Sequence, residues 1–311
     1  MIEITHLKKL FGELVAVDDI SFKVVPGEIL GFLGPNGAGK STTMKVITGF
    51  LSPSSGSVSI WGSDIETDTL AAQKHIGYLP EGAPCYEEMT PRSFLRFIAR
   101  IRGFSGDDVD TVVSRVVATL SLHSVIDQRI ETLSKGFKRR VGLAQAILHD
   151  PEVLILDEPT DGLDPNQKHQ VREMIRGLSK DKIVIISTHI LEEVTAVCNR
   201  AVIIANGKIV ADCSPEELEA RSRYHQAITL NASSESDVQS IAEFLAGVQG
   251  VAEVEVDGLE LIAIPQDQQN GLLAKVIEGV GSKGLAVSGL YQEKGRLDEV
   301  FRQITEEVDH V

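Results

Sequence analysis

GPNGAGKST, residues Gly34 to Thr42, follows the strand-like run EILGFL and precedes a helix-like run that starts at Lys40. The stretch matches the pattern G-x-x-x-x-G-K-[ST] in the strand-to-helix setting that this pattern requires. Its glycines let backbone N–H groups surround phosphate oxygens, which Lys40 would neutralise, and the Ser41 hydroxyl could bind Mg²⁺. The stretch therefore predicts a nucleoside triphosphate site; a glycine-rich structural turn is the alternative. The expected nucleotide contacts are Gly34, Asn36, Gly37, Ala38, Gly39, Lys40, Ser41 and Thr42.

Strand-like and helical patterns alternate on both sides of this loop as far as about residue 210. The apolar runs EILGFLG, VLILDE and KIVIIST each end at a turn signal, which is typical of interior strands in a sheet covered on both faces. The predicted class is α/β. Residues 90–120 instead carry helical spacing, with Thr90 and Pro91 as cap and first-turn residues. We therefore expect a first domain at 1–220 that contains a helical subdomain at about 88–150.

Two of the predicted strands end in side chains that suit hydrolysis of a phosphoanhydride. VLILDEPT ends in Asp157 and Glu158, which would lie beside the phosphate loop because strand carboxyl ends share one sheet edge. Asp157 could hold the Mg²⁺ shell and Glu158 could take a proton from an attacking water. KIVIISTHIL delivers His189 to the same edge, where its imidazole could contact the γ-phosphate or the water. The alternatives are a solvated acidic turn and a structural histidine.

The basic stretch LSKGFKRR, Leu133 to Arg140, predicts a second anion site. Ser134 stands where a helix N-cap should, and Val141, Ala144 and Ile147 continue as an apolar helix face. The helix N-terminus would present Ser134 and the backbone N–H groups around Gly136 to an anion. A second site of this kind, about ninety-five residues after the first, calls for a second nucleotide or a second subunit.

A smaller domain is expected at 226–311, after a polar segment at 220–225 that looks like a linker. Its patterns follow the order β-α-β-β-α-β, which is ferredoxin-like, and a final helix RLDEVFRQITEEV closes the chain. Asp257-Gly258 between VAEVEV and LELIAI favours a type I′ hairpin. Residues 222–311 hold 15 Asp and Glu against 6 Lys and Arg, so this accessory α+β domain is acidic.

Composition narrows the class of protein. The chain has 311 residues, a formal net charge of -15 and no apolar run near the ~20 residues that a membrane span needs. The acidic balance argues against binding to nucleic acid, because that partner favours a basic surface. The start MIEITHLKKLFG lacks the apolar stretch of a secretory signal, so we expect a cytoplasmic protein. Cys85, Cys198 and Cys213 fit no metal spacing, and reduced thiols are expected.

Taken in order, these motifs resemble the nucleotide-binding subunits of ABC transporters. The resemblance covers nearly all of residues 1–215, with Walker A at Gly34–Thr42, a signature at Leu133–Phe137, Walker B at Val153–Glu158, a D-loop at Asp161–Asp164 and a switch histidine at His189. It implies a P-loop NTPase core that binds ATP and Mg²⁺. It also implies that Phe11 stacks on adenine, with an ordinary core aromatic as the alternative, and that Asp164 lies near the nucleotide.

The resemblance further implies a head-to-tail homodimer in which the P-loop of one subunit and the signature of the other enclose each ATP. Glu158 would be the general base, His189 the γ-phosphate contact, and Ser134 with Gly136 the contacts made in trans. Two departures from the family pattern stand out. Lys135 and Phe137 replace a Gly and a Gln of the usual signature, and Glu81, in IGYLPEG, replaces the Gln of the Q-loop. Glu81 could still contact Mg²⁺ or the water.

The details are similar to the ATPases of ABC-2 type exporters, especially the gliding-motility-associated and multidrug or sodium export types. The residues that carry this likeness are YLPE, LSKGF with its basic run, EPTDGLDPNQ, STHILEEV and LDEVF. Such a subunit would lie on the cytoplasmic face of the membrane, where residues 82–92 and the helical subdomain receive an integral membrane permease. Lys138, Arg139 and Arg140 would contact the partner subunit or the permease, or form a solvated face. A soluble ABC-type ATPase with a non-transport role, or a module that binds ATP without turnover, is the rival interpretation.

Overall fold

The computed structural model describes residues 1–83, 85–266 and 271–309, and the chain divides into two compact units. The first is built from Met1–Cys213 and the second from Ser214–Glu307. The strands of the first unit are β1 (Ile2–Phe11), β2 (Leu14–Val24), β3 (Ile29–Leu33), β4 (Ser55–Ile60), β5 (Ser63–Asp64), β6 (Ile76–Leu79), β7 (Val153–Asp157), β8 (Ile183–Thr188), β9 (Arg200–Ala205) and β10 (Lys208–Cys213). Its helices there are α1 (Lys40–Ile47), α2 (Thr69–Lys74), α3 (Pro91–Ile101), α4 (Asp107–Thr119), α5 (Lys135–Ile147), α6 (Pro165–Leu178) and α7 (Leu191–Val197), with short 3-10 turns at His123–Val125 and Ile130–Thr132.

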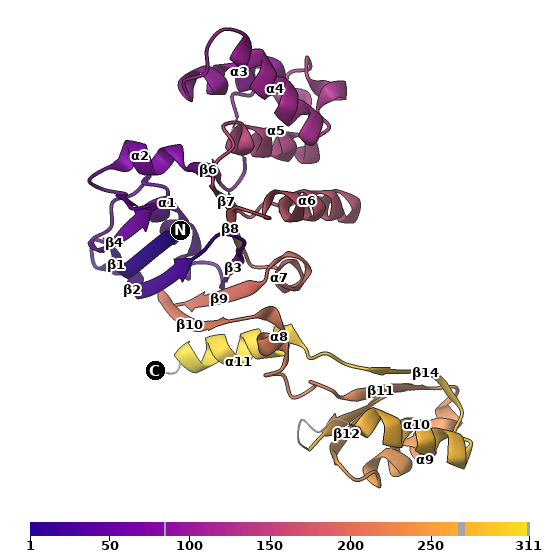
Figure 1. The fold of residues 1–311 in the computed structure, drawn as a ribbon. Coiled ribbons are helices and arrows are strands. Elements are labelled where there is room, and N and C mark those ends of the chain that lie inside the picture. The colour runs from indigo at the N-terminus through magenta and orange to yellow at the C-terminus, as the bar shows by residue number, and fades with distance from the viewer. Residues whose placement is uncertain (84, 267–270, 310–311) are drawn as a thin grey trace. The chain divides into compact units, whose positions relative to one another are not determined.

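A six-stranded sheet forms the centre of the first unit, in the order β10-β9-β3-β8-β7-β6. The pairs from β9 to β6 are parallel, and only the edge pair of β10 with β9 is antiparallel. Strand residues alternate between two cores. Val153, Ile155 and Ile183 face α1, whereas Leu154 and Val184 face the other helices. Figure 1 shows α1 on one side of this sheet and α6 and α7 on the other. The α/β prediction is confirmed.

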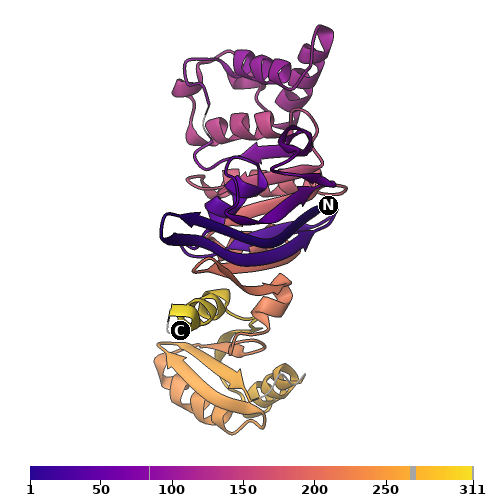
Figure 2. The same cartoon turned by 90° about the vertical axis from the view of Figure 1, so that its left-hand side faces the viewer.

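An antiparallel sheet of order β2-β1-β4-β5 covers the α1 side. Figure 2 shows its long β1–β2 hairpin in front of the parallel sheet. Ile2, Ile4 and Val58 are buried on its inner face and pack in the same core as Met44 of α1. The P-loop leads directly into α1, and α1 is packed between the two sheets. This packing fixes the position of the loop.

The predicted helical segment within 90–120 forms α3 and α4. Thr90 caps α3: its side chain accepts a hydrogen bond from the Ser93 backbone N–H, and the Ser93 hydroxyl oxygen accepts one from the Thr90 backbone N–H. Pro91 lies in the first turn. On α4, Val109, Val113 and Val116 are buried at helical spacing. These helices share one core with α5, so the stretch that carries the signature is held by the helical subdomain.

The second unit has the predicted β-α-β-β-α-β order. Its elements are α8 (Pro215–Glu219), β11 (Ile228–Ala232), α9 (Glu235–Ala246), β12 (Val251–Asp257), β13 (Glu260–Pro265), α10 (Leu272–Lys283), β14 (Val287–Gln292) and α11 (Leu297–Asp309). The sheet order is β12-β13-β11-β14 with antiparallel pairs, which is the ferredoxin-like arrangement. Ile241 and Leu245 of α9 and Val276 of α10 pack on one face of this sheet. The sequence predicts the second of these helices at about residues 270–281, and residue 270 lies outside the described residues.

Two local expectations in the second unit are wrong. Residues 220–225 do not form an exposed linker, because Ser222 and Tyr224 are buried. The Tyr224 ring lies against the guanidinium groups of Arg223 and Arg296, at 4.7 and 3.8 Å from the ring centroid. The segment therefore combines exposed charged residues, such as Arg223, with buried Ser222 and Tyr224.

The hairpin between β12 and β13 is not type I′. Asp257 pairs with Glu260, so Gly258 and Leu259 are the two turn residues. Type I′ requires positive φ at both of them, and only Gly258 has it, at 60°. The register therefore places glycine first in the turn, one position away from the expected Asp-Gly pair.

Across the part of the chain that the structure describes, no helix combines the length and the apolar character that spanning a membrane requires.

Candidate nucleotide-binding site

The P-loop, Gly34–Thr42, connects β3 to α1 and is held by close backbone contacts. A Cβ added at Gly34 would lie 2.3 Å from the carbonyl oxygen of Ile204, and one at Gly39 would lie 2.4 Å from that of Ala16. Gly39 also has a φ of 106°, which L side chains rarely adopt. It is the N-cap of α1 and supplies no side-chain hydrogen bond to the helix. The first-turn N–H groups are therefore left to an anion.

Lys40 is buried at the centre of this loop. Its Nζ donates to the carbonyl oxygens of Gly34 and Pro35 at 2.6 and 3.1 Å. Burial lowers the pKa of Lys40, and the carboxylates of Glu158, Asp157 and Glu81 raise it. No carboxylate of the described residues lies within ion-pair distance of its Nζ. The cation is thus held in the loop by neutral carbonyls and can turn to a phosphate.

Ser41 and Asp157 form the oxygen pair beside the loop. Asp157 ends β7, is 1% exposed, and its Oδ1 accepts a hydrogen bond of 3.4 Å from the Ser41 hydroxyl. No cluster of three or more His, Cys, Asp or Glu side chains suited to a metal is present among the described residues. One hydroxyl and one carboxylate fit Mg²⁺, which takes few protein ligands and fills its octahedron with phosphate oxygens and water.

Glu158 and His189 meet because their strands are neighbours. Asp157 of β7 pairs with Ser187 of β8, and the residues that follow bring Glu158 Oε1 to 2.8 Å from His189 Nδ1. Glu158 Oε2 is buried and has no hydrogen-bond partner among the described residues. Glu158 also adopts a φ of 49°, a left-handed conformation that costs a non-glycine residue about 1 kcal/mol or more. The Glu158 carboxylate is thus fixed by His189 through one oxygen, and its other oxygen is buried without a partner among the described residues.

Glu81 lies in the loop after β6 and is exposed. It makes no hydrogen bond or ion pair with any described residue. Its carboxylate nevertheless acts on both Lys40 and Tyr78: it raises the pKa of Lys40 after Glu158 and Asp157, and it adds to the larger effect of burial in raising that of Tyr78. Glu81 therefore belongs to the same acidic group as the carboxylates at the end of β7.

The signature, Leu133–Phe137, lies at the start of α5. Ser134 is the N-cap, and its Oγ accepts a hydrogen bond of 3.4 Å from the Phe137 backbone N–H. Gly136 is buried: a Cβ there would lie 2.6 Å from the side chain of Gln167. Among the described residues, no hydrogen bond or ion pair joins Ser134 or Gly136 to the P-loop. Within one chain the structure thus brings the P-loop, Asp157, Glu158 and His189 together but not the signature.

Asp164 and Phe11 have different settings from the residues above. Asp164 caps α6, and its Oδ1 accepts a hydrogen bond of 2.9 Å from the Gln167 backbone N–H. Phe11 ends β1 and is 47% exposed, with Lys9 Nζ 5.2 Å from its ring centroid. It is therefore not a core aromatic, and its ring is open to a stacking partner. Its hairpin also contains Ala16, whose carbonyl oxygen contacts the P-loop at Gly39.

Arg139 was expected on the surface, and this expectation is wrong. Arg139 is 5% exposed, and its Nη1 is buried without a partner among the described residues. The other two basic residues do lie at the surface: Lys138 pairs with Glu87, and Arg140 donates to Gln170. Helical spacing carried a usable signal, because Arg139 lies three residues from both Gly136 and Gly142, and all three are on the buried face of α5.

Sequence reasoning also missed a tether beside His189. Thr188 Oγ1 donates to Glu193 Oε2 at 2.9 Å and accepts from the Ile190 backbone N–H at 3.1 Å. Burial raises the pKa of Glu193, and the Thr188 hydroxyl opposes this shift. The two bonds fix the backbone on both sides of His189. The sequence STHILEEV offers two glutamates there, and only the tertiary structure distinguishes the buried one.

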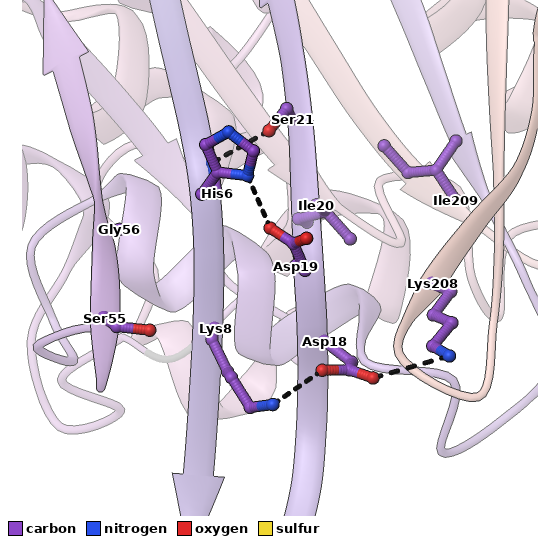
Figure 3. A pocket seen from close by; sticks show the side chains of 10 residues that line it. All are labelled: His6, Lys8, Asp18, Asp19, Ile20, Ser21, Ser55, Gly56, Lys208 and Ile209. Atoms are coloured by element: carbon purple, nitrogen blue, oxygen red, sulfur yellow. Dashed lines mark hydrogen bonds and ion pairs between the residues drawn. The ribbon is translucent and has the colours of Figure 1, made fainter.

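A hollow of about 840 Å³, separate from the P-loop, lies beside the β1–β2 hairpin (Figure 3). His6 Nδ1 pairs with Asp19 at 2.7 Å, and Lys8 pairs with Asp18 at 2.8 Å. Lys208 lies 3.6 Å from the other oxygen of Asp18. The charged side chains that line this hollow are thus paired with one another. Lys40 of the P-loop instead has no ion pair with a described residue, and the nucleotide is best placed at the P-loop.

Comparisons with known proteins show the family to which the chain is similar. A protein-family profile described as "ABC transporter" matches residues 17–161. The chain is 38% identical over 220 residues to Nod factor export ATP-binding protein I of Paraburkholderia xenovorans (strain LB400), which covers 70% of this chain and 72% of that protein. The protein of the same name from Rhizobium sp. (strain N33) is 32% identical over 305 residues, or 98% of this chain and 96% of that one. A solved ATP-binding subunit of an ABC transporter has a TM-score of 0.65 at 30% identity, covering 71% of this chain and 92% of that structure.

Proposed function

The chain belongs to the family of ABC transporter ATP-binding proteins and is an ATPase of that type, and from this premise we propose that it powers an ABC-2 type membrane exporter. The proposal includes the site residues, a homodimer closed by ATP, and a separate permease. The single observation that carries it is the sheet edge at which Lys40 of the P-loop, Asp157, and the Glu158–His189 pair converge. Each of the next steps uses these residues.

ATP is bound through its phosphates. The first-turn N–H groups of α1 and the Lys40 ammonium surround the β- and γ-phosphates, and the exposed ring of Phe11 stacks on the adenine. Ser41 and Asp157 would hold Mg²⁺, and Glu81, whose charge acts on Lys40 together with that of Asp157, would add a carboxylate to its water shell. When bound, the metal neutralises charge on the phosphate oxygens. The other contacts to the nucleotide come from the backbone of the P-loop.

Glu158 acts as general base for the attacking water. Its unused Oε2 accepts the proton, while Oε1 remains on His189. Glu158 has a left-handed backbone directly after β7, and among the carboxylates that act on Lys40 of the phosphate loop its effect is the largest. His189 has half of its side chain exposed, so it can both orient Glu158 and reach the γ-phosphate. A positioned base contributes about 10² to 10⁴ in rate.

A second copy of the chain completes each site. Ser134 is exposed at the N-terminus of α5, where N–H groups and the helix dipole favour an anion, yet no contact joins the signature to the P-loop within the described part of one chain. In a head-to-tail dimer, the signature of one subunit covers the γ-phosphate bound by the other. ATP closes the dimer by bridging it, and hydrolysis followed by release of phosphate reopens it.

The permease is proposed to dock on an apolar hollow of about 590 Å³ between the loop after β6 and the helical subdomain. Phe50 and Tyr86, at its rim, are 76% and 59% exposed. Tyr86 packs edge-on against Phe94 and Phe97. Exposed aromatics gathered at one hollow favour a protein partner. Two of the relatives are export ATP-binding proteins by name, which supports export as the direction and a peripheral place at the cytoplasmic face of the membrane.

Two experiments test this function. In single-turnover assays with ATP and Mg²⁺, Glu158→Gln should lower hydrolysis by about 10² to 10⁴ while ATP still binds. If Glu158→Gln hydrolyses ATP at the wild-type rate, the assignment of the base is wrong. Co-purification from membranes tests the partner: Tyr86→Glu should lose an integral membrane protein that the wild type retains. Ile101→Glu is the matched control, because Ile101 lies on α3 outside the hollow and is about as exposed as Tyr86. A chain that retains no membrane protein supports the non-transport alternative.

A further inference from the structure

Glu193 is a buried carboxylate that the proposed function does not use. It lies in the first turn of α7, is 3% exposed, and its Oε2 accepts a hydrogen bond of 2.9 Å from the Thr188 hydroxyl. Its Oε1 is buried without a partner, so among the described residues Thr188 is the one hydrogen-bond partner of this side chain. Burial of a carboxylate with so few hydrogen bonds is costly. The segment that Thr188 holds therefore indicates what Glu193 does.

The Thr188 hydroxyl ties together the two ends of a short connection. β8 ends at Thr188 and α7 begins at Leu191, so the connection consists of His189 and Ile190. Thr188 Oγ1 accepts a hydrogen bond of 3.1 Å from the Ile190 backbone N–H while it donates to Glu193. Glu193 in turn donates its own backbone N–H to the Ile190 carbonyl oxygen, at 3.1 Å. His189 is thus held between neighbours that are fixed on both sides.

The His189 side chain depends on this backbone for its position. Half of the side chain is exposed, and its one hydrogen bond to a described residue joins Nδ1 to Glu158 Oε1 at 2.8 Å. Glu158 has no second anchor, because its Oε2 has no partner among the described residues. A shift of the connection would therefore move the imidazole and, with it, the carboxylate that is the proposed general base.

We propose that Glu193 is a positioning residue for ATP hydrolysis: through the Thr188 hydroxyl it fixes the connection that carries His189, and His189 holds Glu158 at the attacking water. This inference rests on the proposed function, which assigns Glu158 as the base and His189 as its partner. Glu193 touches neither the nucleotide nor the water. It acts on the rate of hydrolysis and not on ATP affinity, because it is not among the contacts of Lys40 and the P-loop.

Single-turnover hydrolysis at saturating ATP, with ATP binding measured by calorimetry, tests this role in the full chain. Glu193→Leu removes the acceptor of the Thr188 hydroxyl. It should lower the rate by about 10- to 100-fold and leave ATP affinity within about threefold of wild type, because a catalytic group displaced by about 1 Å costs that order of rate. Glu193→Gln keeps an acceptor oxygen for Thr188, so its rate should stay within about threefold of wild type.

A double-mutant cycle with His189 separates positioning from a general structural effect. In a His189→Ala background, Glu193→Leu should lower the rate by less than about threefold, because the side chain that it positions is gone. Glu192→Leu is the matched control, because Glu192 is the adjacent, exposed glutamate of α7. It should change the rate and the affinity by less than about twofold.

Thr188→Val serves in the same cycle if Glu193→Leu does not fold, because it removes the same hydrogen bond and keeps the branched shape of threonine. Thr188→Ser restores the hydroxyl and is its rescue. A Glu193→Leu or Thr188→Val variant that hydrolyses ATP at the wild-type rate, or that loses the same factor with and without His189, overturns the inference. A wild-type chain that hydrolyses no ATP overturns the proposed function instead.

Discussion

Ser134 offers a way to break the trans contact without disturbing the subunit that carries it. It is exposed, and its Oγ caps α5 through the Phe137 backbone N–H. Aspartate and asparagine are N-caps as good as serine, so Ser134→Asp and Ser134→Asn both keep the helix start. Only the aspartate adds a negative charge at the point where the partner's γ-phosphate is proposed to lie. Comparing Ser134→Asp with Ser134→Asn therefore separates the effect of the added charge from that of the changed side-chain shape.

The expected magnitude follows from the distance of such a contact. Two unit charges about 4 Å apart repel by roughly 1 kcal/mol in water and about 4 kcal/mol in a half-buried site. At 1.4 kcal/mol for each factor of ten, Ser134→Asp should lower ATP hydrolysis by about 5- to 700-fold. Ser134→Asn adds no charge, so it should lower hydrolysis by less than Ser134→Asp does. Both should unfold within about 0.5 kcal/mol of wild type, because the cap is kept.

Steady-state ATPase activity and ATP-induced dimerisation of the Glu158→Gln background, followed by light scattering, provide the readouts. Ser134→Asp should bind ATP as a monomer with near wild-type affinity and yet fail to dimerise. Wild-type hydrolysis and dimerisation by Ser134→Asp would refute the trans contact. Gly136→Asp is a poorer test, because its Cβ would meet Gln167 of the same chain at 2.6 Å and disturb α5 against α6.

Three further predictions concern stability and affinity. Gly39→Ala should lower the free energy of unfolding by about 2 kcal/mol or more in chemical denaturation, because its Cβ would lie 2.4 Å from the Ala16 carbonyl oxygen at a φ of 106°. Gly37 has a φ of 84° but open space around it, so Gly37→Ala should lower the free energy of unfolding by only about 1 kcal/mol. Burial, with help from nearby cations, lowers the pKa of His149 to about 4 from 6.5. The unfolded chain then binds the extra proton between these pH values, so stability should fall by roughly 1–2 kcal/mol as the pH drops from about 6.5 to about 4. This slope should shrink in His149→Gln, and an equal slope in both proteins would contradict it. Phe11→Ala should weaken ATP binding by about tenfold in calorimetry with little change in stability, and Phe11→Tyr should not; equal affinities would remove Phe11 from the adenine site.

The parts of the site that could be predicted are those set by strand ends and helix starts. Apolar runs identified β3, β7 and β8, and parallel strands bring the residues after Asp157 and Thr188 to one edge regardless of the rest of the fold. Ser134 was recognisable as an N-cap from residue type and the apolar periodicity that follows it. Local rules of this kind also gave Thr90 as the cap of α3 and the order of helices and strands in the second unit.

The parts that could not be predicted depend on which charges are buried. In LSKGFKRR three adjacent cations look alike, and only the packing of α5 against the loop after β6 shows that Arg139 is inside. Glu193 and Tyr224 are similar cases, since each looks solvent-exposed in the sequence and is buried with a specific partner in the structure. The prediction of the β12–β13 turn failed for another reason. The strand register, and not the Asp257-Gly258 dipeptide, decides which residues occupy the turn.

The central claim is that each ATP lies between two copies of this chain, and a mixing experiment tests it most directly. Lys40→Ala removes the P-loop cation and leaves the signature intact, whereas Ser134→Asp does the reverse, so neither should hydrolyse ATP alone. In a mixed head-to-tail dimer, one site combines the intact P-loop of the Ser134→Asp chain with the intact signature of the Lys40→Ala chain. Single-turnover hydrolysis of an equimolar mixture should therefore recover to about a quarter of wild type, because half of randomly formed dimers are mixed and each has one intact site. If the mixture stays as inactive as its components, the site is not shared between subunits and the account is wrong.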